Sequence, residues 1–375
     1  MILRPYGIVL DGRLEVGVEA IFEGKEVREI RPHTGIPSPF VLSPAFVNHH
    51  SHLEYRGLMG AIPAREYWPW IREITRMKRT QEEEIVARDA RQAAIENRAC
   101  GVGAIAEHSD RPVAAEALVA AGLTGIVFQE VITFFETQGP QEKLAAIESR
   151  AESQRAHGLS VHLTPHAPYT VDEDTLRTLA AKGDPLSIHA AETPLEDAFF
   201  REGRGPIGDL HRELGLPMRT AGVGVVEYLA GLGFLRPGVQ FVHACAIDDG
   251  DIETIAQGGV AVAHCPRSNR TLGCPIAPVR RMIEAQVPVG LGLDSAASSG
   301  PIDIFAEMRE AVESSHRLHE PLTPEAVWRM ATAPLPWSFP TTGWIAIHVA
   351  DAHHTLDLIE RGRPDRVEQL RLIEA

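Results

Sequence analysis

Short runs of apolar residues recur along the chain, and longer segments with helical spacing separate them. Eight such runs lie at 41–48, 102–108, 123–131, 159–166, 186–192, 239–244, 260–265 and 287–294. The segment 81–99 predicts one intervening helix, because Glu82 to Glu84 suit a helix N-terminus and Val86, Ala90 and Ala93 mark one apolar face. Apolar strands that alternate with helices indicate a parallel sheet covered on both faces, and eight such strands close a (β/α)8 TIM barrel.

The first forty residues follow a different pattern. They alternate between strand-like stretches and turn signals at Asp11-Gly12 and Glu23-Gly24, and they contain no helix-length segment. Strand-like stretches return after Gly343, at WIAIHV and TLDLI. We therefore expect a small β-sandwich-like domain built from residues 1–40 and 341–375, and a barrel domain built from residues 41–340.

Composition and charge narrow the class of protein. Of the 375 residues, 44% are hydrophobic and 23% are charged, which is the balance of a globular protein with a packed core. The 36 Lys and Arg against 51 Asp and Glu give a formal net charge of −15, which argues against nucleic acid as a partner. The four cysteines form no Cys-x-x-Cys pair, and no segment approaches the roughly 20 apolar residues of a membrane span. We expect a cytoplasmic protein with no membrane partner.

Polar residues of ligand type stand at the ends of several expected strands, where the reactive groups of such barrels lie. They are His50 and His52 after the first run, His189 and Glu192 after the fifth, His243 after the sixth and Asp294 after the eighth. Residues two apart in an extended segment point to the same side, so His50 and His52 can hold one ion while His49 faces away. Imidazole with carboxylate suits zinc, with iron, cobalt and manganese as alternatives.

Each of these residues also has an ordinary structural role when it is taken alone. A single histidine at a strand end is often a hydrogen-bonding residue, Asp294 could cap a helix that follows it, and Glu192 could be an acid in the first turn of a helix. Ligand-type residues at several strand ends, in barrel order, together indicate a metal site.

Four sequence blocks carry a resemblance to a known family. PAFVNHHSHLE (44–54), HAAET (189–193), HCPRSN (264–269) and GLGLDS (290–295) resemble the signature blocks of the amidohydrolase superfamily. The similarity is closest to the branch that holds cytosine, guanine and S-adenosylhomocysteine deaminases and the triazine chlorohydrolases. It implies a metal-dependent (β/α)8 barrel in which one divalent metal is bound by His50, His52, His189 and Asp294. No lysine stands at a strand end, so the site is expected to be mononuclear.

The resemblance also implies catalytic roles. Glu192 matches the proton-shuttling acid of the deaminases, and His243 matches the histidine that touches the metal-bound hydroxide and the electrophilic carbon. Asp294 can orient and deprotonate the water. A bound zinc lowers the pKa of its water from about 15.7 to about 7, which supplies hydroxide for attack on an aromatic amidine with release of ammonia. A chlorohydrolase or a cyclic-amide hydrolase with the same residues stays open as an alternative.

Two further blocks concern the substrate. PHAPY (165–169) contains His166 and resembles the block of adenosine-type deaminases whose histidine contacts the substrate. EYWPWI (66–71) follows the first strand, where Trp68 and Trp70 either face a nucleoside or pack against a helix. Together the two blocks favour a 6-aminopurine nucleoside as substrate.

Within the branch, the resemblance is greatest to the aminodeoxyfutalosine deaminases of menaquinone biosynthesis, whose nucleoside substrate carries a benzoate. Such a carboxylate needs an arginine, and the candidates near the expected strand ends are Arg56, Arg65, Arg267 and Arg270. Deamination of S-adenosylhomocysteine or methylthioadenosine is the close alternative. Many relatives are dimers or larger, so a homo-oligomer stays open.

Overall fold

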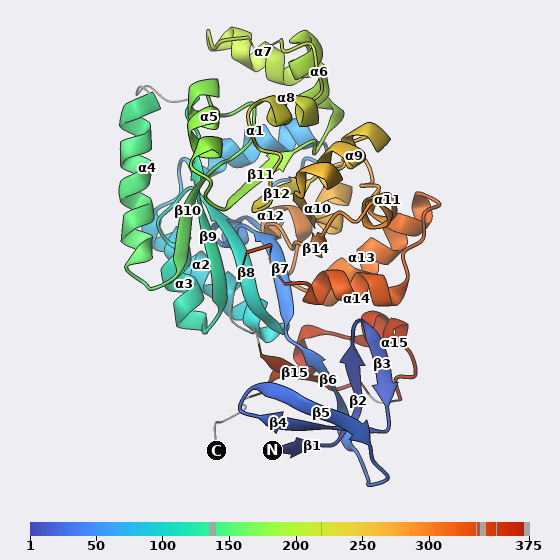
Figure 1. Ribbon diagram of the computed structural model, residues 1–375. Coiled ribbons are helices and arrows are strands. Elements are labelled where there is room, and N and C mark those ends of the chain that lie inside the picture. The colour runs from blue at the N-terminus through green and yellow to red at the C-terminus, as the bar shows by residue number, and fades with distance from the viewer. Residues whose placement is uncertain (135–139, 219, 335, 338–342, 350, 371–375) are drawn as a thin grey trace.

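All eight expected strands are present in the computed structural model, which describes residues 1–134, 140–218, 220–334, 336–337, 343–349 and 351–370 (Figure 1). The strands form two four-stranded parallel sheets. The first sheet contains β7 (Phe46–Ser51), β8 (Val102–Ser109), β9 (Thr124–Val131) and β10 (Ser160–Pro165), in this spatial order. The second contains β11 (Leu186–Ala190), β12 (Val239–His243), β13 (Ala261–His264) and β14 (Val289–Leu291).

The two sheets adjoin at both edges through a few hydrogen bonds. At one edge the backbone N–H of Asp294 donates to the carbonyl of His50 at 2.9 Å, and Ser51 forms an isolated bridge with Asp294. At the other edge the N–H of His189 donates to the carbonyl of His166 at 3.0 Å. The strands follow one another in barrel order, but their ladders do not close into one continuous sheet.

Helices follow most of the strands. The expected helix at 81–99 is confirmed as α2, and its buried side chains include Val86, Ala90 and Ala93. The helices are α1 (Tyr67–Lys78), α2 (Glu83–Ala99), α3 (Ala114–Ala121), α4 (Pro140–Arg155), α5 (Glu173–Ala181), α6 (Pro194–Glu202), α7 (Gly205–Glu213), α8 (Val225–Gly231), α9 (Asp249–Gly258), α10 (Pro266–Thr271), α11 (Val279–Glu284), α12 (Ala296–Ser299), α13 (Ile304–Arg317), α14 (Pro324–Thr332) and α15 (Thr355–Arg361). No helix among the described residues is long and apolar enough to cross a membrane.

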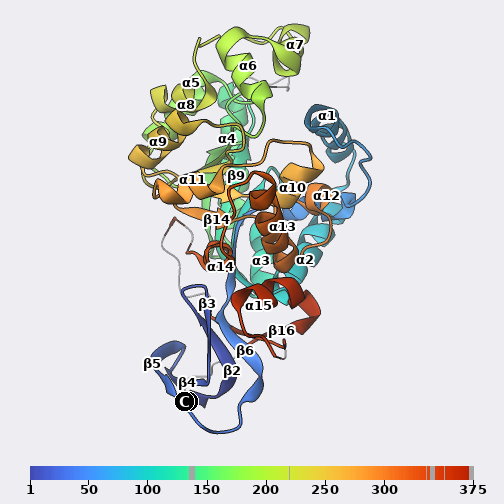
Figure 2. The same cartoon turned by 90° about the vertical axis from the view of Figure 1, so that its right-hand side faces the viewer.

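Strands from both ends of the chain meet in one sheet, which lies below the parallel sheets in Figures 1 and 2. Its strands are β2 (Pro5–Leu10), β3 (Arg13–Val16), β6 (Ser38–Pro44), β15 (Trp344–Ile347) and β16 (Val367–Gln369), and β15 pairs antiparallel with β6. A smaller sheet contains β1 (Ile2–Leu3), β4 (Val18–Glu23) and β5 (Glu26–Pro32).

The strand expected at TLDLI is wrong, because these residues begin helix α15. Thr355, Leu358 and Ile359 are buried and stand at positions i, i+3 and i+4, which is the helical period. Asp357 and His354 form a reciprocal capping box at the helix N-terminus. The spacing of apolar and polar residues in this short segment is therefore that of an amphipathic helix.

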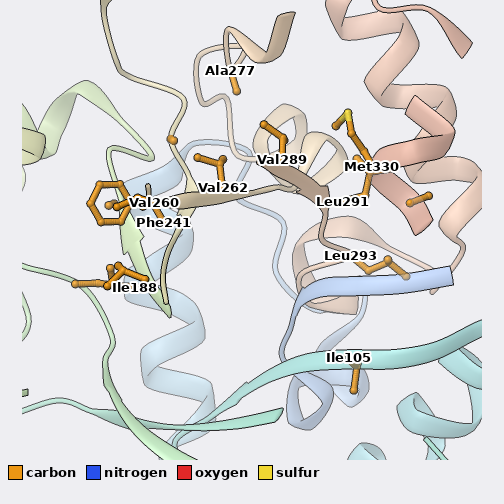
Figure 3. Packing of buried hydrophobic residues seen from close by; sticks show 14 of the residues in the cluster. Ile105, Ile188, Phe241, Val260, Val262, Ala277, Val289, Leu291, Leu293 and Met330 are labelled. Carbon is orange, nitrogen blue, oxygen red and sulfur yellow. The ribbon is translucent and has the colours of Figure 1, made fainter. Parts of the chain in front are cut away.

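The main core lies between the parallel strands and the helices that cover them. Figure 3 shows Ile105, Ile188, Phe241, Val262 and Leu291, which come from five different strands and are at most 1% exposed. Burying large apolar side chains of this kind contributes about 1.5–3 kcal/mol each, so the core holds the strand ends in fixed positions. The functional side chains project from those ends.

Candidate active site

The predicted ligand residues converge at the carboxyl ends of the parallel strands. The ligand atoms of His50, His52 and His189 lie within 4.8 Å of one another, and so do those of His50, His243 and Asp294. The Nε2 atoms of His52 and His189 are 3.3 Å apart, and Nε2 of His50 is 3.7 Å from Oδ1 of Asp294. The structure therefore brings together five residues that the sequence placed at four separate strand ends.

The donor set fits a divalent cation. Burial lowers the pKa values of His50 and His52 well below the usual value, and the neighbouring imidazoles lower them further. The rings are neutral at pH 7 and offer lone pairs, which is the form that binds metals. Both nitrogens of His50 are buried without a hydrogen-bond partner among the described residues, a costly arrangement for a site holding only protein atoms. Nδ1 of His189 lies 2.8 Å from the carbonyl of His166, to which it donates, so Nε2 keeps its lone pair toward His52.

The backbone at these strand ends is strained. His243 has φ 74° and Asp294 has φ 52°, in the left-handed region that non-glycine residues rarely adopt. Asn48 helps to hold this geometry, because its Oδ1 accepts hydrogen bonds from the N–H of Leu293 at 2.9 Å and of His50 at 3.3 Å. Strain that the surrounding bonds maintain is typical of functional sites.

Glu192 lies beside these imidazoles as a buried acid. Its side chain is 6% exposed, and Oε1 lies 3.6 Å from Nε2 of His243. Burial raises the pKa of Glu192 well above its usual value, and the nearby charge of Asp294 raises it further. A raised pKa favours the protonated form of this carboxyl group, which can donate its proton to a bound molecule.

His243 is oriented by Asn269. Oδ1 of Asn269 lies 2.8 Å from Nδ1 of His243, and an amide oxygen can only accept, so Nδ1 carries the hydrogen. Burial lowers the pKa of His243 to about 4, and the ring is therefore neutral. Its Nε2 lone pair faces Glu192 and the ligand cluster.

A cavity of about 1050 Å³ opens onto this cluster. Its walls include His52, His189, Glu192, His243 and Asp294, and also the predicted substrate-binding residues His166 and Trp70. Trp70 is 5% exposed and belongs to a small apolar cluster with Tyr67 and Ile74. Trp70 therefore both packs against its neighbours and lines the cavity.

The sequence reasoning missed two buried polar residues, His108 and Glu130. Their ligand atoms and those of His189 lie within 4.8 Å of one another, and Oε1 of Glu130 is 3.7 Å from Nδ1 of His108. Burial raises the pKa of Glu130 to about 7, and neither of its carboxylate oxygens has a hydrogen-bond partner among the described residues. The sequence pattern could have indicated both residues, because His108 and Glu130 stand at the ends of the second and third apolar runs.

The expectation that Arg56, Arg65, Arg267 or Arg270 lies beside the substrate cavity is wrong. Arg56 pairs with Glu96 at 2.7 Å and Arg270 pairs with Glu310 at 2.7 Å, so both charges are already partnered on the outside of the fold. Arg267 lies 3.5 Å from Glu307, and Arg65 is exposed. None of these four described arginines is among the residues that line the cavity.

The family follows from a match that covers most of the chain. Residues 41–334 match the model of the Amidohydrolase family. The chain belongs to the amidohydrolase family. The fold of this family is known as a (β/α)8 barrel, and the strand order described above agrees with it.

Individual proteins resemble this amidohydrolase over most of their length. The aminodeoxyfutalosine deaminase of Deinococcus radiodurans is 32% identical over 345 residues, which cover 87% of this chain and 79% of that protein. The 5-methylthioadenosine/S-adenosylhomocysteine deaminase of Pyrococcus abyssi is 29% identical over 364 residues, covering 88% and 79%. An adenosine deaminase structure from Xanthomonas campestris with bound zinc superposes with a TM-score of 0.80 at 20% identity, over 98% of this chain and 90% of that one, which shows a shared fold.

Proposed function

We propose that this amidohydrolase is a metal-dependent hydrolytic deaminase of a 6-aminopurine nucleoside. The observation that carries the proposal is the place of Glu192, a buried acid with a raised pKa that lines a cavity of about 1050 Å³ and whose Oε1 lies 3.6 Å from Nε2 of His243. Deamination of an aromatic amidine needs such a group, because a ring nitrogen and the leaving amine must both be protonated. The resemblance to deaminases of adenine nucleosides supports the same reaction.

His50, His52, His189 and Asp294 would hold one divalent metal, with zinc as the proposed ion and iron, cobalt and manganese as alternatives. The zinc in the Xanthomonas campestris structure supports this choice. When bound, zinc lowers the pKa of a coordinated water to about 7. The carboxylate of Asp294 is oriented by the N–H of Ser295 at 2.7 Å and the hydroxyl of Ser298 at 3.3 Å.

The side chains then divide the proton transfers between them. Asp294 accepts a proton from the attacking water at its carboxylate. Glu192 delivers its proton to the ring nitrogen next to the reacting carbon and takes back a proton from the hydroxyl that forms on this carbon, and the proton held by Asp294 goes to the amine. A carbon–oxygen bond forms, the carbon–nitrogen bond breaks, ammonia leaves and a carbonyl remains. His243 presents Nε2 toward the reacting carbon, held in place by Asn269.

The proposed substrate is 6-aminodeoxyfutalosine, which would place the enzyme in menaquinone biosynthesis. The relative from Deinococcus radiodurans supports this choice. Methylthioadenosine and S-adenosylhomocysteine form the second candidate, which the relative from Pyrococcus abyssi supports. His166 and Trp70, which line the cavity, are the proposed contacts to the nucleoside.

The test is ammonia release by zinc-loaded protein from six compounds: aminodeoxyfutalosine, S-adenosylhomocysteine, methylthioadenosine, adenosine, guanine and cytosine. We expect turnover of the adenine nucleosides, with aminodeoxyfutalosine preferred. Turnover of guanine or cytosine alone would contradict the proposed ring. Silence across the whole panel with metal bound would refute the deaminase proposal and direct the search to chlorinated triazines and cyclic amides.

We also propose that residues 1–40 and 341–375 form one small β-sandwich-like domain and that residues 41–340 form the catalytic one. One sheet that contains β2 and β3 from the first part of the chain and β15 and β16 from the last part supports a shared small domain, and its strand β6 crosses the proposed boundary and continues to Pro44. Limited proteolysis would test it, because a domain boundary predicts cleavage near residue 40 or 341 before cleavage within the barrel.

A further inference from the structure

Glu192 carries a negative charge during part of the proposed reaction, in a place that offers little compensation for it. Between delivering its proton to the ring and taking one back, its carboxyl group is an anion whose side chain is only 6% exposed. No lysine or arginine forms an ion pair with Glu192 in the part of the chain that the structure describes. His243, 3.6 Å away, is neutral because burial lowers its pKa to about 4, and the charge of Asp294 opposes a second negative charge. A buried anion of this kind needs hydrogen-bond donors.

Two tyrosine hydroxyls stand next to this carboxyl group. The side chain of Tyr67 hydrogen-bonds Glu192, and this bond lowers the pKa of Glu192 against the larger effect of burial. The hydroxyl oxygens of Tyr67 and Tyr169 are 2.8 Å apart, and both residues line the cavity. We call Tyr169 and Tyr67 the tyrosine relay. A further donor, the thiol of Cys274, lies 3.9 Å from Oε1 of Glu192 and is weak.

The tyrosine relay can follow the charge of Glu192, because each phenol hydroxyl has one hydrogen to donate. When Glu192 is ionised, Tyr67 donates to the carboxylate and Tyr169 donates to Tyr67. When Glu192 is protonated, the two hydroxyl hydrogens can reverse, and none of them is transferred between the groups. Only the first arrangement places a charge-assisted hydrogen bond on Glu192, and the donation from Tyr169 strengthens it by about 10–30%. The tyrosine relay therefore favours the ionised state of the acid.

Packing holds both rings of the tyrosine relay in place. Tyr67 begins helix α1 and is 7% exposed, and it packs in a cluster with Trp70 and Ile74, at positions i, i+3 and i+7 of one helix face. Tyr169 is 4% exposed and belongs to the main core. The backbone carbonyl of Tyr169 lies 3.0 Å from Nε2 of His211. The hydroxyl donors therefore have a fixed geometry at the carboxyl group before any substrate binds.

The backbone that carries Glu192 is fixed by a second acid. The carboxylate of Glu196 accepts hydrogen bonds from the N–H of Glu192 at 2.7 Å and from the N–H of Ala191 at 3.1 Å. Ala191 has φ 52°, in the left-handed region that non-glycine residues rarely adopt. Because the backbone is held in this way, the orientation of the Glu192 carboxyl group depends on its own side-chain torsions. The hydrogen bond to Tyr67 restricts those torsions.

We propose that the tyrosine relay positions the proton-shuttling acid: Tyr67, supported by Tyr169, holds the Glu192 carboxyl group and stabilises its ionised form between the two proton transfers. The inference rests on the deaminase function proposed above and adds two positioning residues to it. Both tyrosines act through Glu192, so their removal should slow the reaction without weakening the binding of the nucleoside.

The experiment is a double-mutant cycle on zinc-loaded protein, with the adenine nucleoside of the panel that is deaminated fastest. We expect Tyr67→Phe to lower kcat about 10-fold to 100-fold and to leave KM unchanged, because the lost hydrogen bond is made to a charge that forms only during the reaction. In the Glu192→Gln background the same change should lower kcat by less than about 2-fold, since no anion is left to stabilise. Tyr169→Phe should cost roughly 2-fold to 5-fold, because it removes only the support of Tyr67.

Tyr6→Phe on β2 is the matched control. It removes the same hydroxyl from a partly buried tyrosine that does not line the cavity, so it should keep the wild-type kcat and KM. Metal content and urea unfolding show whether each variant folds and holds its metal. Phenylalanine keeps the ring of Tyr67 in its apolar cluster; where Tyr67→Phe does not fold, Tyr169→Phe carries the same cycle with Glu192→Gln and should likewise lose its effect there.

Infrared spectroscopy of the same zinc-loaded proteins observes the carboxyl group directly and needs no turnover. The band of protonated Glu192 is identified by its loss in Glu192→Gln. In Tyr67→Phe this band should persist to a higher pH than in the wild type, because the donor to the ionised form has gone, and Tyr6→Phe should leave it unchanged. The other titratable groups near Glu192 are the same in the wild type and in these two tyrosine variants: His243, Asp294, Glu196, Cys245, Cys265 and Cys274.

Three outcomes would overturn the inference while leaving the deaminase function intact. A wild-type kcat in Tyr67→Phe would show that the hydroxyl is not used. A raised KM with unchanged kcat would make Tyr67 a substrate contact, and an equal loss of kcat in the Glu192→Gln background would make its role structural. If no nucleoside released ammonia, the proposed function would fail and the infrared comparison would still decide: a band that titrates at the wild-type pH in Tyr67→Phe refutes the tyrosine relay, and a shift to higher pH supports it.

Discussion

Gly292 is the position where the smallest change should disturb the reaction centre most. It lies between β14 and Asp294, and a Cβ placed on it would stand 2.8 Å from Cβ of His50, 2.8 Å from Sγ of Cys265 and 3.1 Å from the backbone nitrogen of His50. Nonbonded carbon atoms prefer separations of about 3.5–4.0 Å. Gly292→Ala must therefore push the β7 backbone at His50, since Cβ of His50 is bonded directly to that backbone.

The size of the effect follows from these distances. Relieving the contact with His50 requires a shift of roughly 0.7–1.2 Å, and a misplacement of about 1 Å at a reaction centre costs on the order of 100-fold in rate. Overpacking of a core costs about 1–3 kcal/mol in the free energy of unfolding. We expect Gly292→Ala to lower kcat/KM about 100-fold and to weaken metal binding about 10-fold to 100-fold.

Gly231→Ala is the matched control, because it makes the same substitution where no atom lies within 4 Å of the added carbon. It ends helix α8, where alanine should be neutral or slightly stabilising. The assays are metal content after dialysis against a buffered metal, ammonia release, and urea unfolding of both variants. A Gly292→Ala protein with wild-type metal affinity and wild-type kcat/KM would refute the packing argument at His50.

Three further predictions concern the acid, the metal and pH. Glu192→Gln should keep the metal and lose about 10²-fold to 10⁴-fold in kcat, since the amide group of glutamine cannot shuttle a proton. Wild-type turnover in the metal-loaded variant would contradict this. The control is Glu227→Gln on the exposed face of α8. Elemental analysis should find one tightly bound metal per chain, because Nδ1 of His189, which a second ion beside Glu130 would need, already donates to His166; a requirement for two equivalents would overturn this. Burial lowers the pKa of His49 to about 4, so the unfolded chain takes up a proton at this residue before the folded protein does as pH falls through 6.5. In metal-free protein, the free energy of unfolding relative to that of His49→Gln should therefore fall by about 2 kcal/mol between pH 7 and pH 5. A difference that stays constant over this pH range would contradict the argument.

The parallel strands could be predicted because each of them is marked by a short run of consecutive apolar residues. A strand covered on both faces is apolar throughout, as VAVAHC at 260–265 shows, and the polar residue that ends such a run faces the rim. His50, His189, His243 and Asp294 could be brought together on that basis without any contact information. His108 and Glu130 obey the same rule and could have been found with it.

Charges on helices could not be placed in the same way. The arginines expected near the substrate were chosen for their proximity to strand ends, but Arg270 on α10 pairs with Glu310 on the neighbouring helix α13. Arg150 lines the cavity although it stands 100 positions after His50 in the sequence. Which face a polar helix turns toward a cavity depends on how the helices pack, and a single sequence does not contain that information.

The central claim is that this amidohydrolase replaces the amino group of an adenine nucleoside with an oxygen atom from water. The most direct measurement is mass spectrometry of the product that the zinc-loaded enzyme forms from aminodeoxyfutalosine or methylthioadenosine in water enriched in ¹⁸O. The account predicts one ¹⁸O atom at the ring carbon that held the amino group, with one ammonia released for each product molecule. An intact amino group, or a product with unlabelled oxygen at that carbon, would contradict it.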